Sequence, residues 1–101
     1  MKRARFVAAA RREFLVEVVY YNEEAPGLGA RFAAAVEDAT ARALAFPLAG
    51  APASENTRRV FLKDFPFAVV YRPDADGITI FALSHYSRRP GYWKSRVQDR
   101  G

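Results

Sequence analysis

The sequence predicts an α+β fold in the order β-α-α-β-β-β, with a helical hairpin packed on a mainly antiparallel sheet and a short helix at the end. Large apolar residues recur every three or four positions between residues 8 and 46, which is the period of a helix. After residue 56 the period changes to two, which is the period of a strand. Short turns separate the later strands, which favours antiparallel neighbours. Helices that are segregated from strands in this way are typical of α+β folds.

The first strand and the first helix lie at the start of the chain. Lys2–Val7 alternates apolar and basic residues, as a short strand with one exposed face does. A helix is predicted over Ala8–Asn22, because four apolar residues at spacings of four, four and three share one face: Ala10, Phe14, Val18 and Tyr21. We expect Leu15 and Val19 to widen this apolar stripe.

A second helix is predicted over Leu28–Phe46. It follows a break that contains Pro26 and two glycines, and Pro47 ends it. Its apolar stripe consists of Leu28, Phe32, Val36, Ala39, Ala43 and Phe46. Because the link between the two helices is short, we expect an antiparallel helical hairpin.

Three strands are predicted in the second half of the chain, after a loop over Leu48–Asn56. They are Thr57–Lys63, Phe67–Arg72 and Ile78–Ser84, with turns at Asp64–Pro66 and Pro73–Gly77 between them. Arg58 and Arg59 are neighbours in a strand, so they point to opposite faces and at most one can join a given site. A short basic helix is predicted over Tyr92–Gln98.

Length and composition indicate one domain that spans residues 1–101. Half of the 101 residues are hydrophobic, which is enough for one modest core. The apolar run Phe6–Ala10 is too short for a signal peptide, and no stretch approaches the roughly 20 apolar residues of a membrane helix. The sequence therefore predicts a cytoplasmic protein with no membrane partner.

Metal, cofactor and triad chemistry have little support. The chain has no cysteine, which excludes disulfides, a thiolate nucleophile and thiolate metal ligands. It has one histidine, and its acidic residues show no metal-ligand spacing. Its serines have no recognisable triad partners, and it has no glycine-rich phosphate loop. We expect neither a metal nor a cofactor.

The net charge of +5 is unevenly distributed. Three segments are basic: residues 1–22 carry +3, residues 57–72 carry +3 and residues 84–101 carry +4, whereas residues 23–56 carry −3. This pattern favours a basic face that meets phosphate or an acidic protein partner. A solvated surface with a basic bias is the alternative.

The segment Ser84–Arg96 gathers a histidine, two tyrosines, a tryptophan and four cations where the last strand ends. Histidine can donate or accept a proton near neutrality, arginine can bind phosphate through two parallel hydrogen bonds, and aromatic rings can stack on a base. Each also has a structural alternative. His85 can bond a neighbouring carbonyl, Tyr92 and Trp93 can pack the terminal helix onto the sheet, and Arg88 and Arg89 can be solvated or paired with the acidic second helix.

Four sequence blocks, taken in order, resemble the RelE/ParE toxin superfamily of plasmid-stabilisation proteins. The blocks are Ala9–Tyr21; Pro26–Gly29 with Phe32, Val36 and Glu37; Arg58–Arg59 with Phe65–Phe67 and Val69–Tyr71; and Ile78–Leu83 with His85, Arg88, Pro90, Tyr92, Trp93 and Arg96. Together they span most of the chain. The resemblance implies the compact toxin of a type II toxin–antitoxin system, encoded beside an antitoxin that neutralises it.

The superfamily has two functional branches, and the resemblance implies different residues for each. RelE-like members cut messenger RNA on the ribosome, and the candidates for that chemistry here are Arg59, Arg72, His85, Arg88 and Tyr92. ParE-like members bind DNA gyrase and block replication without recognised catalytic residues. For this branch we expect target binding by the basic segment Arg88–Arg100, through Arg88, Arg89, Tyr92, Trp93, Lys94 and Arg96. We expect the antitoxin to lay an acidic, amphipathic segment on Phe14, Val18, Tyr21, Phe32 and Val36.

The sequence favours the ParE-like branch. RelE-like enzymes usually carry an arginine just before the Val-Tyr stretch of the middle strand, and here that position is Ala68. Cleavage of RNA requires a base for the 2′-hydroxyl and cations for the developing negative charge, so a missing arginine weakens that interpretation. We therefore expect growth inhibition through a protein target such as DNA gyrase. A RelE-like ribosome-dependent endoribonuclease, with ribosome and messenger RNA as partners, is the alternative.

Overall fold

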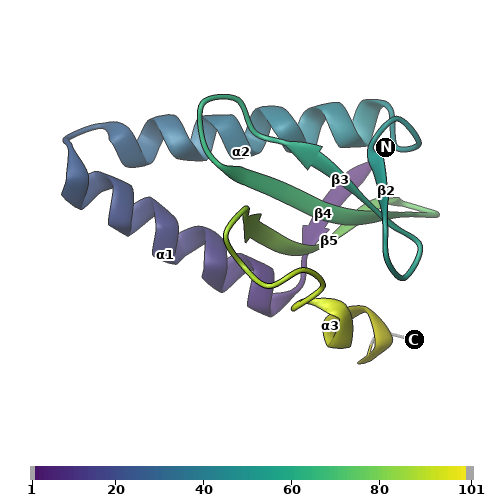
Figure 1. The fold of residues 1–101 in the computed structure, drawn as a ribbon. Helices are drawn as coiled ribbons and strands as arrows, with labels where there is room; N and C mark the ends of the chain where they lie inside the picture. Colours follow the sequence, from purple (N-terminus) through teal and green to yellow (C-terminus); the bar gives the residue numbers. More distant parts are fainter. Residues whose placement is uncertain (1, 100–101) are drawn as a thin grey trace.

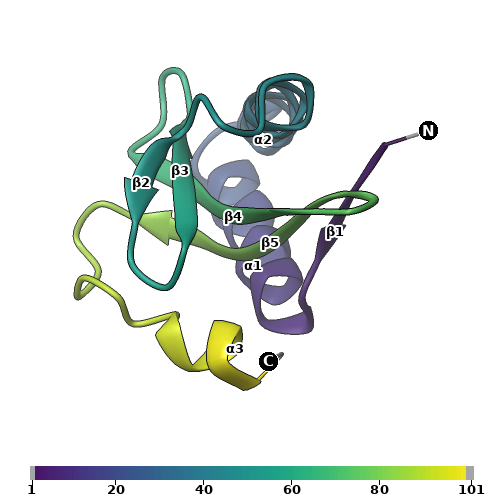
Figure 2. The same cartoon turned by 90° about the vertical axis from the view of Figure 1, so that its right-hand side faces the viewer.

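A helical hairpin covers one face of a five-stranded sheet, and a short helix lies at the other face (Figures 1 and 2). The computed structural model describes residues 2–99. Its elements are β1 (Arg3–Phe6), α1 (Ala8–Glu24), α2 (Leu28–Ala45), β2 (Ala51–Ala53), β3 (Thr57–Phe61), β4 (Phe67–Asp74), β5 (Gly77–His85) and α3 (Lys94–Asp99). The predicted α+β class and the β-α-α-β-β-β order of the long elements are confirmed.

The strands are ordered β1-β5-β4-β3-β2 across the sheet. β5, β4, β3 and β2 pair antiparallel in chain succession, whereas β1 pairs parallel with β5, with Arg3 opposite Gly77 and Phe6 opposite Ile80. The parallel pair is possible because the α1–α2 hairpin and the following strands lie between β1 and β5 in the chain. A hypothetical Cβ at Gly77 would lie 2.0 Å from the Arg3 carbonyl oxygen, so this close approach requires glycine.

The main core lies between the hairpin and the sheet. The predicted stripe of α2 is buried at Phe32, Val36, Ala39 and Ala43, and it packs on side chains of β4 and β5 that include Phe67, Val69, Tyr71, Ile78 and Ile80. From α1, Ala10 is buried and Phe14, Val18 and Tyr21 are partly buried against the same core. Three predicted members of these stripes lie outside: Leu15 and Val19 are about half exposed, and Phe46 follows the last residue of α2 and is exposed.

The two helices approach closely at Gly29. A Cβ at this position would lie 2.5 Å from the backbone oxygen of Val18 and 2.6 Å from the Asn22 side chain. The Gly29 backbone N–H donates a hydrogen bond to Asn22 Oδ1 at 2.9 Å. One of the orphan N–H groups at the start of α2 is therefore satisfied by the preceding helix.

A β-bulge in β5 changes which side chains face the helices. Val70 pairs with Ala82 and Tyr71 pairs with Ile80, so Phe81 has no partner residue on β4. Ile80 consequently faces the main core, Phe81 and Ala82 both face the other side, and Leu83 returns to the main core. Strict alternation would place Leu83 on the same face as Phe81, because both have odd numbers.

A second, smaller core covers the opposite face of the sheet. Trp93 and Val97 from the C-terminal segment pack on Val70, Phe81 and Ala82. Figure 2 shows α3 on the side of β5 that is remote from α2. This arrangement agrees with the structural alternative for Trp93.

Several predicted boundaries are wrong. β2 lies inside the segment predicted as a loop, where Ala51–Ala53 pairs with Thr57–Arg59. The strand predicted over Thr57–Lys63 ends at Phe61, and Asp64 has a positive φ of 68°. β4 and β5 remain paired up to Asp74 and Gly77, which shortens the predicted turn at Pro73–Gly77. These differences have one cause, since pairing with a neighbouring strand decides where a strand ends.

No helix in the described part of the chain combines the length and the apolar character needed to cross a membrane. The described residues contain no cluster of three or more histidine and acidic side chains that could hold a metal ion.

Candidate functional site

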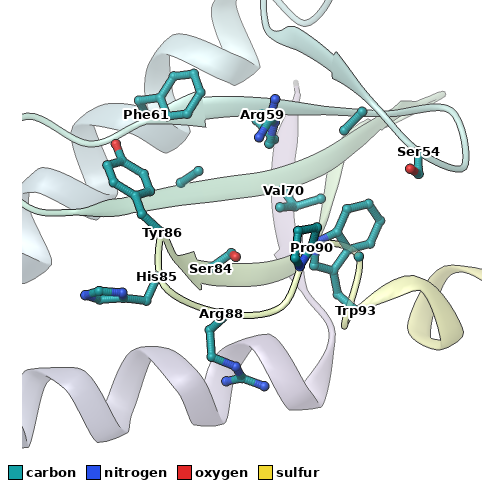
Figure 3. Close-up of a pocket in the computed structure, with 13 residues that line it drawn as sticks. Ser54, Arg59, Phe61, Val70, Ser84, His85, Tyr86, Arg88, Pro90 and Trp93 are labelled. Atoms are coloured by element: carbon teal, nitrogen blue, oxygen red, sulfur yellow. The ribbon is translucent and has the colours of Figure 1, made fainter.

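An open pocket lies on the sheet face opposite the helical hairpin (Figure 3). It has a volume of about 450 Å³. β3 contributes Arg59 and Phe61, β4 contributes Ala68 and Val70, and the end of β5 with the following loop contributes Ser84, His85, Tyr86, Arg88, Pro90 and Trp93. Among the described residues that line it there is no carboxylate, so arginines set its charge.

The alternation of β3 places Arg59 in this pocket and Arg58 outside it. The Arg59 guanidinium lies 5.6 Å from the centre of the Phe61 ring, and the rings of Phe61 and Tyr86 meet edge to face at 6.0 Å. Arg58 points to the other face, where its Nη1 donates to the Gly50 carbonyl oxygen at 2.9 Å. The prediction that only one member of this arginine pair can join a site is therefore confirmed.

His85 ends β5, and its ring points away from Arg59 (Figure 3). The imidazole packs edge to face against Phe67, with 4.9 Å between ring centres. Its Nδ1 accepts a hydrogen bond from the Ser87 backbone N–H at 2.9 Å and lies 2.8 Å from Ser87 Oγ. The structural alternative expected a bond to a neighbouring carbonyl, and the partner is instead the N–H of the turn that follows.

Three of the five candidates for nuclease chemistry line this pocket: Arg59, His85 and Arg88. Their side chains do not converge, because the His85 ring points away from Arg59 and the Arg88 side chain extends toward α1 (Figure 3). The Arg72 guanidinium lies 5.4 Å from the centre of the Phe81 ring and does not line this pocket. The Tyr92 hydroxyl donates to Glu13 on α1. Among the described residues that line the pocket there is no carboxylate, and the one imidazole, His85, points away from Arg59.

Glu13 links the two ends of the chain. Its carboxylate accepts hydrogen bonds from the Tyr92 hydroxyl at 2.7 Å and from both terminal nitrogens of Arg96 at 3.0 and 2.9 Å. It also accepts one from the Leu83 backbone N–H at 3.1 Å, while Arg96 Nη1 donates to the Phe81 carbonyl oxygen at 2.9 Å. Glu13 and Arg96 therefore hydrogen-bond the Leu83 N–H and the Phe81 carbonyl group, which lie on the edge of β5 past the last residue that pairs with β1.

This cluster shifts two pKa values. Burial raises the pKa of Tyr92 to about 12, and the hydrogen bond to Glu13 and its negative charge add to the effect. The hydrogen bond from Arg96 to Glu13 raises the pKa of that guanidinium further above its usual value. Arg96 therefore stays charged and Tyr92 stays neutral at physiological pH.

The basic C-terminal segment divides into structural and exposed residues. Trp93 is 5% exposed and Arg96 forms an ion pair with Glu13, so both side chains have structural contacts, and target binding by them stays a prediction. Tyr92 is partly buried and held by the same carboxylate. Arg88, Arg89 and Lys94 are exposed. Arg100, at the end of the predicted segment, lies outside the described residues.

The residues predicted to contact the antitoxin are mostly covered in this structure, and their role stays a prediction. Phe32 is fully buried, whereas Val36 is 2% exposed and lines a groove between α1 and α2. Phe14, Val18 and Tyr21 are only partly accessible. Leu15 and Val19, which were expected to widen the core-facing stripe, lie instead on an exposed apolar side of α1. Four large side chains on this side are between 49 and 63% exposed: Leu15, Val16, Val19 and Tyr20. These four residues are separated by one, three and one positions, which places them on one side of a helix, and this spacing can be read from the sequence.

The described elements form a small α+β domain with a helical hairpin on one face of a mainly antiparallel sheet. The chain is similar to the solved structure titled "Chromosomal ParDE TA system from P. aeruginosa", with a TM-score of 0.71 and 15% sequence identity over 84% of this chain and 96% of that chain. The family described as "ParE toxin of type II toxin-antitoxin system, parDE" matches residues 5–90. The protein belongs to this ParE toxin family. No curated protein matches the sequence significantly.

Proposed function

We propose that this protein inhibits bacterial growth by binding DNA gyrase and that a cognate antitoxin neutralises it. The observation that carries the proposal is membership of the ParE toxin family. Two of the five candidates for RNA cleavage, Arg72 and Tyr92, lie outside the sheet pocket and are held by other contacts, which supports it. A toxin that acts by binding needs accessible surface and no catalytic group.

The surface proposed to bind the target is the sheet face with the loop after β5. Arg59, Phe61 and Tyr86 present a cation beside two exposed rings, and Arg88, Arg89 and Lys94 add exposed positive charge. Aromatic and arginine side chains are the groups that contribute most to protein interfaces. The excess of positive charge would also speed association with an acidic target surface.

The surface proposed to bind the antitoxin is the exposed side of α1. Leu15, Val16, Val19 and Tyr20 form an apolar stripe there, and an apolar groove of about 400 Å³ lies beside Leu15, between α1, α2 and β1. An amphipathic antitoxin segment could cover this stripe with its own apolar face. Arg11 and Arg12 are exposed on the same helix and would attract acidic residues of that segment.

The proposal can be tested by brief expression in bacteria, followed by measurements of DNA synthesis, messenger RNA and gyrase-linked DNA breaks. We expect breaks, halted DNA synthesis and filamentous cells while transcripts persist. Rapid loss of transcripts with continued DNA synthesis would instead establish the ribonuclease alternative. In that case His85→Ala and Arg88→Ala would abolish cleavage. A gyrase binder would keep its fold in both variants.

A further inference from the structure

Two hollows of the surface meet at Arg59 and Phe61 on β3. The first is the open pocket on the sheet face described above. The second has a volume of about 410 Å³ and lies between β3 and the end of α2, where Arg42 and Phe46 line it. Arg59 and Phe61 line both hollows and therefore form a ridge between them. Neither the family match nor the target surface proposed above assigns a role to the second hollow.

The ridge carries one cation that no carboxylate of the described residues neutralises. Arg59 is exposed, and no ion pair between described residues involves it. No carboxylate of the described chain lines either hollow. The other arginine of the second hollow is already bound, because Arg42 pairs with Asp38 at 3.2 Å and donates to the Phe61 carbonyl oxygen at 2.9 Å. A single partner carboxylate therefore has one preferred position, which is on Arg59.

Three exposed aromatic rings surround this cation. Phe46 is 68% exposed, Tyr86 is 56% exposed and Phe61 is 44% exposed. Figure 3 shows Arg59 and Phe61 side by side on β3, with Tyr86 facing the Phe61 ring. An arginine among exposed aromatic rings has the composition of the residues that contribute most to protein interfaces. Large apolar side chains that gather on a surface in this way indicate a partner.

The arrangement fits a protein segment better than a nucleic acid. A nucleic-acid strand carries a phosphate at every nucleotide, and its binding requires several cations along its path. Arg88, the other arginine of the first hollow, lies 3.8 Å from the centre of the Tyr92 ring and extends toward α1, and Arg42 is paired. One carboxylate flanked by apolar side chains instead matches one unpaired guanidinium between two hollows.

We propose that the ridge anchors a segment of the target protein that crosses β3, with an acidic side chain on Arg59 and an apolar side chain in the hollow beside Phe46. The assignment rests on the proposed function, because it names the chemistry that the toxin recognises on its target. It extends the target surface around β3 onto the end of α2. Both ridge residues belong to a strand that pairs with β4, so binding requires little further ordering of the backbone.

The single tryptophan provides a readout that needs no gyrase. Trp93 lines the first hollow, and the chain has no other tryptophan, so its fluorescence should change when a ligand lies next to Arg59. The probes are a capped tripeptide of phenylalanine, glutamate and leucine, the same peptide with glutamine for glutamate, and a short oligouridylate. We expect the glutamate peptide to change the fluorescence saturably and to bind about tenfold or more tightly than either of the other probes.

Matched variants separate the ridge from net charge and from general apolar contact. Arg59→Gln should weaken binding of the glutamate peptide by about tenfold, whereas Lys63→Gln removes the same charge from an exposed position after β3 and should leave binding within about twofold. Phe46→Ala should weaken binding by about fivefold, whereas Leu48→Ala, at a residue that is 72% exposed and lines neither hollow, should leave it unchanged. All four side chains are exposed, so the fold should tolerate each change.

The same variants are then measured with purified DNA gyrase. We expect the wild-type protein to bind, Arg59→Gln and Phe46→Ala to bind more weakly, and the two control variants to bind as the wild type does. Gyrase binding that Arg59→Gln and Phe46→Ala leave unchanged would overturn the proposal while the proposed function stands. If the wild-type protein does not bind gyrase, the proposed function fails, and the peptide titration alone decides whether the ridge is an acidic-segment site.

Three outcomes of the peptide titration would also overturn the proposal. Equal losses in Arg59→Gln and Lys63→Gln would indicate general charge attraction. Oligouridylate that binds as tightly as the glutamate peptide would indicate a nucleic-acid site, and unchanged Trp93 fluorescence would indicate no binding in the first hollow. None of these results bears on gyrase or on growth inhibition, so the proposed function is judged separately.

Discussion

At the scale of single residues, Glu13 makes long-range hydrogen bonds that its neighbours in the sequence do not predict. It lies on α1, and its side chain is 18% exposed. Its carboxylate accepts hydrogen bonds from partners 70, 79 and 83 positions away along the chain. The negative charge is matched by Arg96, and the remaining lone pairs are occupied by a hydroxyl and a backbone N–H. Such a network is stable because every member is satisfied.

We expect Glu13→Gln to lower the free energy of unfolding by about 2–4 kcal/mol, because it leaves the largely buried Arg96 without a counter-charge. The amide group of glutamine would also direct N–H donors toward the guanidinium. Urea unfolding followed by Trp93 fluorescence measures the change. Glu24→Gln, at the exposed end of the same helix, is the control and should change stability by less than about 0.5 kcal/mol. Equal stability of the two variants would contradict the structural role of Glu13.

At the scale of elements, α1 is apolar on two sides, and each side has a different role. The side with Ala10, Phe14 and Val18 packs on the core, and the side with Val16 and Val19 faces solvent. A helix whose only role was to cover the sheet would carry polar residues on its outer side. The exposed stripe is therefore best explained by a protein partner.

The hairpin depends on the close approach of its helices at Gly29. We expect Gly29→Ala to destabilise the protein by about 1–3 kcal/mol, because the added Cβ would overlap the Val18 backbone oxygen. This loss exceeds the gain in helix propensity, which is about 1 kcal/mol. Thermal unfolding followed by circular dichroism measures it, with Arg31→Ala, at an exposed position in the same turn of α2, as the control. A stabilised Gly29→Ala variant would show that the helices can separate at no cost.

At the scale of the whole molecule, the sheet separates two cores and two sets of exposed groups. The hairpin closes one face, and the segment with Trp93 and Val97 closes part of the other. What is left open on the second face is the pocket with Arg59. Glu13 joins the first helix to Arg96 of the last helix and to the edge of β5, so the alkaline stability of the molecule should report on that junction.

We expect the free energy of unfolding to fall as pH rises from about 10 to about 12. The pKa of Tyr92 is raised from 10.0 to about 12 in the folded protein, so the unfolded chain loses this proton first. The stabilising contribution is complete below pH 10 and is lost as pH rises through the folded pKa. Unfolding by urea at several pH values measures the slope.

Tyr92→Phe should reduce this slope, although part of it should remain because burial also raises the pKa values of Tyr21 and Tyr71. Tyr86→Phe is the control, since Tyr86 is 56% exposed and its hydroxyl makes no hydrogen bond within the described chain. A slope that Tyr92→Phe leaves unchanged would contradict the assigned pKa shift.

Much of the fold could be predicted from local patterns. The helical stripe of α2, the alternation of β3 and the strand-forming residues of β4 each report their own conformation, because side-chain period follows directly from backbone geometry. β2 could not be predicted, since three residues with a proline carry no period and become a strand only by pairing with β3. The bulge at Phe81 has the same origin.

The candidate surfaces were predicted in part. The sequence indicated a basic segment after the last strand, and Arg88, Arg89 and Lys94 are indeed exposed there. The sequence could not distinguish these exposed residues from Trp93 and Arg96, because composition does not show which side of a short helix packs against the rest of the protein. It also assigned partner contact to Phe32 and Val36, whose large apolar side chains fit a core equally well.

The sequence by itself determined the α+β class, the long elements and the resemblance to the toxin superfamily, all of which depend on short-range periodicity and on the order of motifs. Only the tertiary structure decided that Glu13 joins both ends of the chain, that Arg88 lies free on the ring of Tyr92, and that α1 keeps a bare apolar side. The physical reason is separation along the chain. Contacts between residues 70 or more positions apart leave no local pattern, and they form only when the folded backbone brings their partners within hydrogen-bonding distance.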